Sequence, residues 1–265
     1  MAFEELKARQ AVAWSDGRWD QAVEELAPMH DHLAARLEPR PGERWLDVGT
    51  GTGAIALRAA RARATVVGLD LAPGMIEAAR RLAAYEGLDV RFDVGDAEAM
   101  PYAEASFDVV ASAVGAFLTP DHGAVARELA RVCRPDGRLG MTAWRPGTEP
   151  FATYRRFRPP PEPGVGDPQD WGREEYVQSL LGQAFELRFE PGDATFVGPS
   201  GEEAWKESLE IGPTRALVSS LDPDRLEELH RSVVEYFERH RVGDEIRAPA
   251  EYLLILGTRR APNDG

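Results

Sequence analysis

Short apolar runs alternate with longer amphipathic stretches through the middle of the chain. The apolar runs predict strands at 44–48, 65–69, 90–94, 107–113 and 138–144. The stretches between them predict helices near 53–63, 73–86 and 122–133. Pro135-Asp136-Gly137 has the composition of a turn that leads into the last of these strands. Strands that alternate with helices are typical of a parallel sheet wrapped by crossover helices.

The two flanks of this core follow other patterns. Apolar positions recur at helical spacing within residues 1–40, which predicts helices there. Prolines crowd residues 158–168, and we interpret that stretch as a rigid loop inside an added lobe rather than an interdomain linker. Strand-like segments then return at 186–189, 195–197 and 252–256, and Asp222-Pro223 opens an amphipathic helix before the last of them. We therefore predict one domain over 1–265, with a core of 41–145, 185–190 and 250–260 and a cap of 1–40 and 146–249.

Charge and composition narrow the class of partner. The 265 residues carry 31 Lys and Arg against 45 Asp and Glu, a formal net charge of −14, and an acidic surface repels a phosphate backbone. No apolar run reaches the length of about 18 residues that a membrane span needs. The N-terminus has no apolar signal core, and Cys133 is the only cysteine. We expect a cytoplasmic protein that binds neither nucleic acid nor membrane.

A glycine-rich turn is the most informative local motif. The strand ending in Asp47-Val48 runs into Gly49-Thr50-Gly51-Thr52-Gly53, and a helix follows at once. Glycines allow the backbone to turn sharply and a ligand to approach closely, and a helix N-terminus offers free N–H groups to an anion. The same letters also satisfy the dinucleotide fingerprint, with Asp70 where an acid would hold a ribose.

Three carboxylates favour one cofactor over the other. Asp47 precedes the glycines, whereas Asp70 and Asp96 end the second and third strands, and no Lys or Arg occurs between Asp47 and Leu57. A pyrophosphate beside Asp47 would meet like-charge repulsion of about 1–4 kcal/mol. S-adenosylmethionine has no phosphate and carries an amine, a sulfonium, a ribose diol and an adenine amino group. These acids complement it, at the edge where parallel sheets bind ligands.

The chain resembles the class I S-adenosylmethionine-dependent methyltransferases, most of all those acting on ubiquinone and menaquinone precursors and related small molecules. The segments that carry the resemblance are 46–53, 67–75, 95–102, 106–110 and 128–138. The resemblance implies a doubly wound, seven-stranded, mostly parallel α/β sheet, with its last strand antiparallel and a helical cap. It also implies S-adenosylmethionine as cofactor, with a set of binding residues: Asp47, Gly49, Thr50, Gly51, Gly53, Asp70, Leu71, Asp96, Ala97 and Ala113. In that set the glycines line the methionine and ribose, Asp70 and Leu71 take the ribose and adenine, Asp96 and Ala97 take the adenine, and Ala113 meets the methionine end.

No catalytic residue follows from the pattern. Methyl transfer is a displacement that proximity and orientation can accelerate, and a base is needed only when the acceptor must lose a proton. Many small-molecule relatives carry His where Phe117 stands, so that acid or base is absent. We expect His122 to be an exposed neighbour of a helix cap, and keep His30 and His32 as weaker candidates for substrate contact. No cluster has metal-ligand spacing, so no metal is expected.

Aromatic residues suggest where the acceptor binds. Trp14 and Trp19 bracket a turn before the first core strand, and Trp144 ends the fifth, with Phe151, Tyr154 and Phe157 after it. With Phe117, the residues Trp14, Trp19 and Trp144 are the substrate candidates, and they predict a pocket for an apolar or planar small molecule. Packing against the core is the alternative explanation of the same aromatics.

Two other functions remain open on the sequence. One is a nicotinamide-dependent oxidoreductase, and the other is a non-catalytic cofactor-binding protein on the same fold. A tRNA or protein methyltransferase is disfavoured by the charge, and because the segment 113–120 lacks the Asn/Asp-Pro-Pro-aromatic signature of enzymes that methylate amino groups. The acceptor atom and the oligomeric state do not follow from the sequence.

Overall fold

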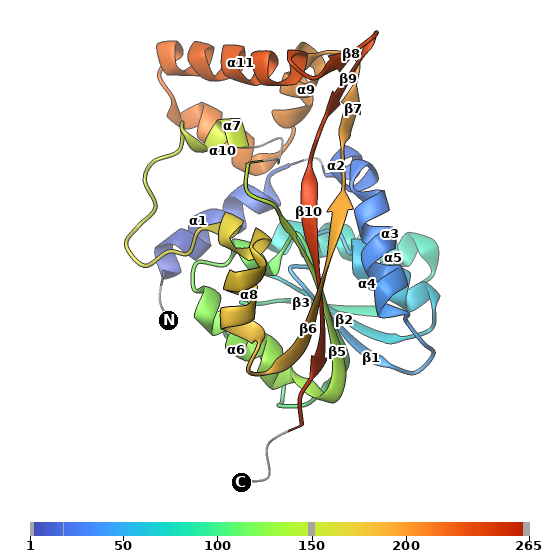
Figure 1. Ribbon diagram of the computed structural model, residues 1–265. Coiled ribbons are helices and arrows are strands. Elements are labelled where there is room, and N and C mark those ends of the chain that lie inside the picture. Colours follow the sequence, from blue (N-terminus) through green and yellow to red (C-terminus); the bar gives the residue numbers. More distant parts are fainter. Residues whose placement is uncertain (1–2, 18, 148–151, 262–265) are drawn as a thin grey trace.

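A computed structural model describes residues 3–17, 19–147 and 152–261 (Figure 1). Its centre is a seven-stranded sheet in the order β3-β2-β1-β4-β5-β10-β6, in which β10 runs antiparallel to both neighbours. The strands are β1 Arg44–Val48, β2 Thr65–Asp70, β3 Val90–Val94, β4 Phe107–Ala113, β5 Cys133–Trp144, β6 Phe185–Asp193 and β10 Glu251–Arg259. The predicted fold class, including the antiparallel last strand, is confirmed.

The predicted limits of β1 to β4 hold closely, whereas β5, β6 and β10 are longer than the strands predicted at 138–144, 186–189 and 252–256. Strands β1, β3 and β4 coincide with their predictions, and β2 is one residue longer. Strand β5 begins at Cys133 rather than Arg138, so the predicted turn at 135–137 lies within the strand. Its register against β4 shifts between the pairs Phe107–Cys133 and Val109–Arg138, and Asp136 has a φ of 59°. The turn residues form an irregularity of the ladder and do not end it.

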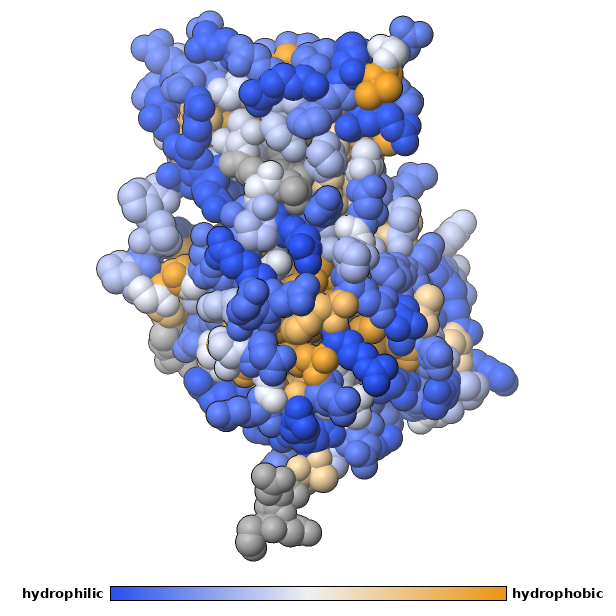
Figure 2. Space-filling view, viewed as in Figure 1, coloured by the Kyte–Doolittle hydropathy of each residue, from blue (hydrophilic) through white to orange (hydrophobic). Residues whose placement is uncertain are grey.

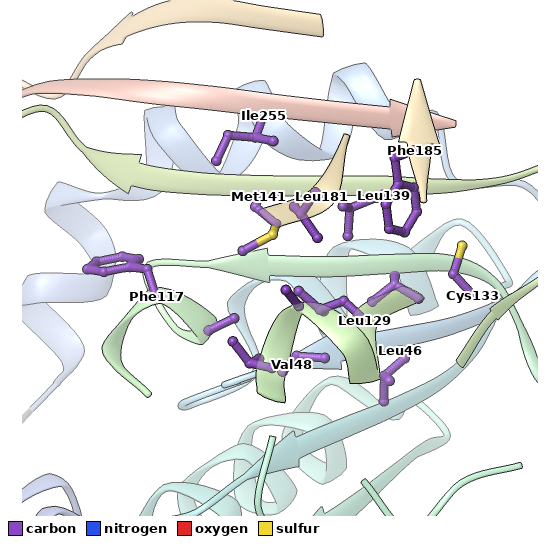
Figure 3. Packing of buried hydrophobic residues seen from close by; sticks show 14 of the residues in the cluster. Leu46, Val48, Phe117, Leu129, Cys133, Leu139, Met141, Leu181, Phe185 and Ile255 are labelled. Carbon is purple, nitrogen blue, oxygen red and sulfur yellow. The ribbon is translucent and has the colours of Figure 1, made fainter. Parts of the chain in front are cut away.

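Helices cover both faces of the sheet, and each face has its own core. On one face lie α3 (Ala27–Leu37), α4 (Ala54–Arg61) and α5 (Pro73–Glu86), whose buried residues pack with Trp45 and Tyr252. On the other face lie α6 (His122–Val132), α8 (Glu174–Leu181) and the short helix η2 (Pro168–Gly172). Figure 3 shows this second core, where Leu129 and Leu181 approach the strand residues Leu139 and Met141. These two layers make the sheet doubly wound.

The cap is smaller than predicted and is not wholly helical. Helix α3 and the segment with η2 and α8 fall within the predicted cap ranges, but they pack on the sheet because their apolar faces bury Leu33, Trp171 and Leu181 there. The upper lobe in Figure 1 has a separate core around Phe157, Trp205 and Phe237. Its helices are α7 (Ala152–Arg155), α9 (Gly201–Ser208), α10 (Gly212–Ser220) and α11 (Pro223–Glu238). It also holds a three-stranded sheet, β7-β9-β8, made of β7 Phe196–Gly198, β8 Arg241–Val242 and β9 Glu245–Ala248.

A two-stranded ribbon joins this lobe to the main sheet. Strand β6 continues into β7, and β9 continues into β10, so the two chain segments rise side by side (Figure 1). Between the two ladders the N–H of Ala194 donates to the carbonyl of Ala250 at 2.9 Å. The segment from 199 to 244 is therefore an insertion at the far end of the ribbon.

The first helix, α1 (Glu4–Ser15), lies where the lobe meets the main sheet (Figure 1). A short helix, α2 (Asp20–Glu25), connects it to α3. Figure 2 shows a largely hydrophilic upper lobe and an apolar area at the level of β6 and β10. A shallow groove there is lined by Leu37, Arg138 and Leu256, toward the end of the strands opposite to α1. Within the described ranges, no helix combines the length and apolar character that crossing a membrane requires.

Candidate cofactor site

The glycine loop adopts the backbone that only glycine tolerates well. Gly49, Gly51 and Gly53 have φ values of 64°, 54° and 93°, and α4 begins at the next residue. A Cβ built on Gly51 would have no heavy atom within 4 Å, so that part of the loop faces open space. A Cβ on Gly49 would lie 2.7 Å from the Cα of Gly115. The loop is thus anchored on the side of β4 and open at Gly51, as a cradle for a ligand requires.

Asp47 supports the loop from below. Its side chain is buried and accepts hydrogen bonds from Thr50 Oγ1 at 2.7 Å and from the Ala56 N–H at 3.0 Å. Burial raises the pKa of Asp47 from 3.8 to about 7, against the effect of these bonds. Near neutral pH the carboxyl is therefore partly protonated, and its charge excludes an anion less strongly than the sequence suggested. Asp47 and Thr50 are internal braces of the loop.

Asp70 joins the loop to the next strand. One of its carboxylate oxygens accepts from the Gly51 N–H at 2.8 Å, and the other accepts from the Ala72 N–H at 2.9 Å. Burial raises the pKa of Asp70, and its bonds to backbone N–H groups oppose that rise. Leu71 follows half-buried, so the end of β2 and the glycine loop form one rim.

Asp96 lies beyond the end of β3 and is paired with a residue that was not among the predicted ones. Lys7, on α1, places its Nζ 2.8 Å from Asp96 Oδ2 and 2.5 Å from Glu98 Oε2. Asp96 Oδ1 accepts from the Glu98 N–H at 2.8 Å, and Ala97 is half-buried between the two acids. The one signal in the sequence was that Lys7 and Lys206 are the only lysines among 31 Lys and Arg.

The end of β4 completes the edge. Ala113 is half-buried, and the next residue, Val114, has a φ of 52°, which is rare for a β-branched side chain. Thr142 Oγ1 accepts a hydrogen bond from the Val114 N–H at 3.2 Å and helps to hold this conformation. Strain of this kind clusters at functional sites. Val114 and Gly115 were not among the predicted residues, because neither has an unusual side chain.

Helix α1 crosses this edge and contacts three of its loops. Besides Lys7, Gln10 Nε2 donates to the Leu118 carbonyl at 3.3 Å, and the Gly74 N–H donates to Ser15 Oγ at 3.1 Å. The residues that Lys7, Gln10 and Ser15 contact lie in the segments after β3, β4 and β2 respectively. On the side of the upper lobe, Arg215 of α10 pairs with Asp16 at 3.1 Å. The helix therefore lies between the sheet edge and the lobe and contacts both.

The aromatic candidates fall into different environments. Trp14 and Trp19 are half-buried and stacked, with ring centroids 5.0 Å apart, and Trp19 Nε1 donates to the Trp14 carbonyl at 3.2 Å. Trp144 is half-buried at the end of β5. Phe117 is only 3% exposed and belongs to the core of Figure 3, so it does not line an open surface.

The aromatics expected after β5 do not reach the sheet edge. Tyr154 and Phe157 pack in the separate core of the upper lobe. Phe151 lies outside the described residues. Among the aromatic candidates that the structure describes, the pair Trp14–Trp19 and the single Trp144 are therefore the ones that are only half-buried.

One of the three candidate histidines differs from the prediction. His122 is buried, not exposed, because its Nδ1 pairs with Tyr176 Oη at 2.8 Å and its ring packs beside Trp171. Burial lowers its pKa. His30 is buried on α3, and burial lowers its pKa to about 4, while His32 Nδ1 lies 2.8 Å from Tyr252 Oη. In the described ranges, no three His, Cys, Asp or Glu side chains converge as metal ligands would.

The residues at this edge of the sheet offer the kinds of hydrogen-bonding group that S-adenosylmethionine requires. The open cradle at Gly51 offers room for a carboxylate at a helix N-terminus, and Asp70 and Asp96 offer acceptors at the ends of adjacent strands. Each of these carboxylate oxygens can accept one hydrogen bond more than the one described above, which comes from Lys7 for Asp96 Oδ2 and from a backbone N–H for the other three.

Comparison with known proteins gives consistent matches. A family model described as a methyltransferase domain matches residues 46–137. An uncharacterised protein of Mycobacterium tuberculosis is 40% identical over 183 residues, 67% of this chain and 66% of that protein. Nocamycin O-methyltransferase of Saccharothrix syringae is 43% identical over 124 residues, 45% of this chain and 44% of that enzyme. Aklanonic acid methyltransferase of a Streptomyces species is 39% identical over 150 residues, 54% of this chain and 68% of that enzyme.

A solved structure agrees in fold. The YcgJ protein of Bacillus subtilis superposes with a TM-score of 0.63 at 21% identity, over 90% of this chain and 99% of that one. The sequence matches cover just under two thirds of the length of the mycobacterial relative and less of the nocamycin enzyme. The match to the family model, over residues 46–137, includes the glycine loop and the ends of β1 to β4.

Proposed function

Because the chain belongs to the class I S-adenosylmethionine-dependent methyltransferase family, we propose that it transfers a methyl group from S-adenosylmethionine to a small molecule. S-adenosylhomocysteine is the second product. The observation that carries this proposal is the continuous rim formed by the open cradle at Gly51, by Asp70 bonded to it, and by Asp96 just after the end of β3.

The roles of the rim residues follow from their chemistry. N–H groups at the start of α4 take the cofactor carboxylate, because the Gly51 N–H is already bonded to Asp70. Asp70 also accepts from the ribose hydroxyls, and Asp96 accepts from the adenine amino group. Leu71 and Ala97 contact the adenine ring, and Ala113 lies toward the methionine end. Asp47 and Thr50 contribute by holding the loop in shape.

The bound cofactor supplies an electrophilic methyl group on a sulfonium. The protein then has to hold the acceptor in line with that group and exclude water, which is catalysis by proximity and orientation. An acceptor that is already anionic needs no base, whereas a neutral hydroxyl does.

The acceptor is a planar or apolar small molecule. The stacked, half-buried indoles of Trp14 and Trp19 support this, because aromatic faces beside the sheet edge bind flat rings well. Two relatives are named for small molecules, nocamycin and aklanonic acid, and the first is named an O-methyltransferase. Oxygen is the acceptor atom that we propose on that basis. Membership of the ubiquinone-like group stays a prediction, as do the cytoplasmic location and the lack of a nucleic-acid partner.

Ligand-dependent melting tests the cofactor. A ligand present at a hundred times its dissociation constant stabilises the folded state by about 2.7 kcal/mol. S-adenosylhomocysteine should raise the melting temperature, whereas NAD and NADP should not. Stabilisation by NAD alone would instead favour the oxidoreductase.

Turnover then separates an enzyme from a non-catalytic binder. A panel of phenols, quinols, carboxylic acids and amines with labelled S-adenosylmethionine should give a labelled product with an oxygen acceptor. Binding of S-adenosylhomocysteine without turnover on any member would favour the non-catalytic alternative.

A further inference from the structure

Helix α1 is attached to the sheet edge by a buried charge. Lys7 is the only residue of α1 that is buried, at 5% exposure. Its neighbours on the helix are half-buried or exposed, including Val12 at 70% exposure. A helix that covers a site without an apolar face depends on such specific polar contacts for its position.

The partners of Lys7 belong to the candidate cofactor rim. Its ammonium group bridges Asp96 Oδ2 and Glu98 Oε2. Glu98 Oε1 in turn accepts from the N–H of Asp121, which caps α6. One cation thus joins α1, the loop after β3 and the start of α6.

The two carboxylates need this cation. Their side chains are only 15% and 5% exposed and both lie within hydrogen-bond distance of the same nitrogen. Like charges that lie this close repel each other, and buried charges require a partner. Without Lys7, the Asp96 carboxylate would be pushed away from Glu98 and lose its fixed orientation. An ammonium also costs less to place here than elsewhere, since both acids compensate it.

The hydrogen bonds of Asp96 leave room for a ligand. Oδ1 accepts from the Glu98 N–H and Oδ2 accepts from Lys7, while an ionised carboxylate has about four acceptor positions. These two hydrogen bonds fix the orientation of the carboxylate, and therefore the directions in which its free acceptor positions point. We propose that Lys7 is a positioning residue of the cofactor site, which acts through Asp96 to orient its carboxylate toward the adenine amino group. This inference rests on the proposed function. It gives α1 the role of placing Lys7 beside Asp96.

A pair of ligands isolates the effect. S-adenosylhomocysteine carries the adenine amino group, whereas S-inosylhomocysteine has a carbonyl oxygen at the same place. Dissociation constants of both are measured by calorimetry for the full chain and for Lys7→Met, with Asp96→Asn as a reference. Lys206→Met is the matched control, because Lys206 is the other lysine and lies exposed on α9 beside Glu203.

The expected result is selective. Lys7→Met should weaken S-adenosylhomocysteine roughly tenfold, or about 1.4 kcal/mol, and leave S-inosylhomocysteine nearly unchanged. The preference for adenine should therefore fall toward that of Asp96→Asn, and Lys206→Met should keep the native preference. Equal weakening of both ligands would show that Lys7 only anchors α1, and tighter binding of S-adenosylhomocysteine would show that Lys7 competes with adenine for Asp96. Either result, or no change, overturns the proposal.

Two further variants guard against misfolding. Lys7→Arg keeps the cation and should keep the adenine preference, whereas Lys7→Gln keeps a donor without the charge and should lose it. If Lys7→Met does not fold, Lys7→Arg and Lys7→Gln test the effect of the charge instead. An equal preference of these two variants for S-adenosylhomocysteine over S-inosylhomocysteine would contradict the proposal. Native protein that binds neither ligand would refute the proposed function itself and this inference with it. Native binding with unaltered variants would refute the inference alone.

Discussion

Gly49 and Gly115 pack backbone against backbone between the loops that follow β1 and β4. A Cβ added at Gly115 would lie 2.8 Å from the Gly49 carbonyl oxygen and 2.9 Å from its Cα. These contacts are with main-chain atoms, which cannot move aside as a flexible side chain can. The close approach fixes how far the glycine loop stands from the end of β4, and therefore the width of the site.

Gly115→Ala should damage both stability and cofactor binding. Forcing the two backbones apart is overpacking, which costs about 1–3 kcal/mol. Urea unfolding and calorimetry with S-adenosylhomocysteine measure the two effects. Gly123→Ala is the control, because a Cβ there meets the flexible Arg127 at 3.2 Å within helix α6. Equal behaviour of the two variants would contradict the close packing as the cause.

Gly51→Ala should separate backbone strain from ligand contact. Gly51 and Gly87 have φ values of 54° and 67°, and a Cβ at either would meet no heavy atom within 4 Å. Each alanine variant should therefore lose about 1 kcal/mol of stability through strain. Only Gly51→Ala should also weaken S-adenosylhomocysteine, since its methyl group would enter the cradle. Unchanged affinity in Gly51→Ala would remove that cradle from the proposed site.

Asp47→Asn should change how stability depends on pH. The folded pKa of about 7 lies above the ordinary 3.8, so the folded state holds a proton that the unfolded chain releases. Between these values, Asp47 makes native stability fall with rising pH, by at most about 1.4 kcal/mol per pH unit. The asparagine variant lacks this pH dependence. Its free energy of unfolding should therefore rise relative to that of the native protein as the pH increases to 7. The melting temperatures of both proteins are measured from pH 5 to 8. If the two plots against pH run parallel, burial does not raise the pKa of Asp47 in the folded state.

His30→Leu should change the pH dependence of stability in the opposite direction. The folded pKa of about 4 lies below the ordinary 6.5, so the unfolded chain binds the proton more readily. His30 therefore makes stability fall as pH drops from 6.5 to 4, and the variant should be relatively more stable at pH 5 than at pH 7. The slopes of His30 and Asp47 oppose each other in this window. His230→Gln is a suitable control because His230 lies outside the core, beside Glu202 on the upper lobe.

Trp19→Ala should reduce use of the acceptor without affecting the cofactor. Trp19, which stacks on Trp14, would lose its ring contact with the acceptor, worth about 0.5–1.5 kcal/mol, which corresponds to a drop of about 2- to 13-fold in kcat/KM. Trp19→Phe keeps a ring and should lose less. Kinetics with an acceptor from the panel, beside the affinity for S-adenosylhomocysteine, measure both. Unchanged turnover would assign the pair to packing alone.

The core was predictable because its signals are local. Each core strand is a short apolar run, and each helix has its own period and start signal, as Pro73 has for α5. The glycine loop is likewise specified by adjacent residues. Such features need no knowledge of the rest of the chain.

The remaining features depend on contacts between distant residues. Lys7 and Asp96 are separated by 89 positions, so no period or spacing connects them. In the small sheet, β7 matches the strand predicted at 195–197 to within one residue, whereas β8 and β9, with two and four residues, are too short for a clear alternating pattern. His122 follows an N-cap, which predicts exposure, yet η2 and α8, which are distant in the sequence, cover it.

The ribbon that joins the two lobes limits how they can move. Its register is set by paired residues from Arg259–Phe185 to Glu251–Asp193, and again at Ala248–Phe196. Sliding one strand along the other would break every one of these pairs and turn each side chain to the wrong face. The lobe therefore cannot translate along the ribbon, and the hydrogen bond from the Ala194 N–H to the Ala250 carbonyl holds the two segments together between the ladders. The distance between the lobe and the main sheet along the strand axis is therefore constant.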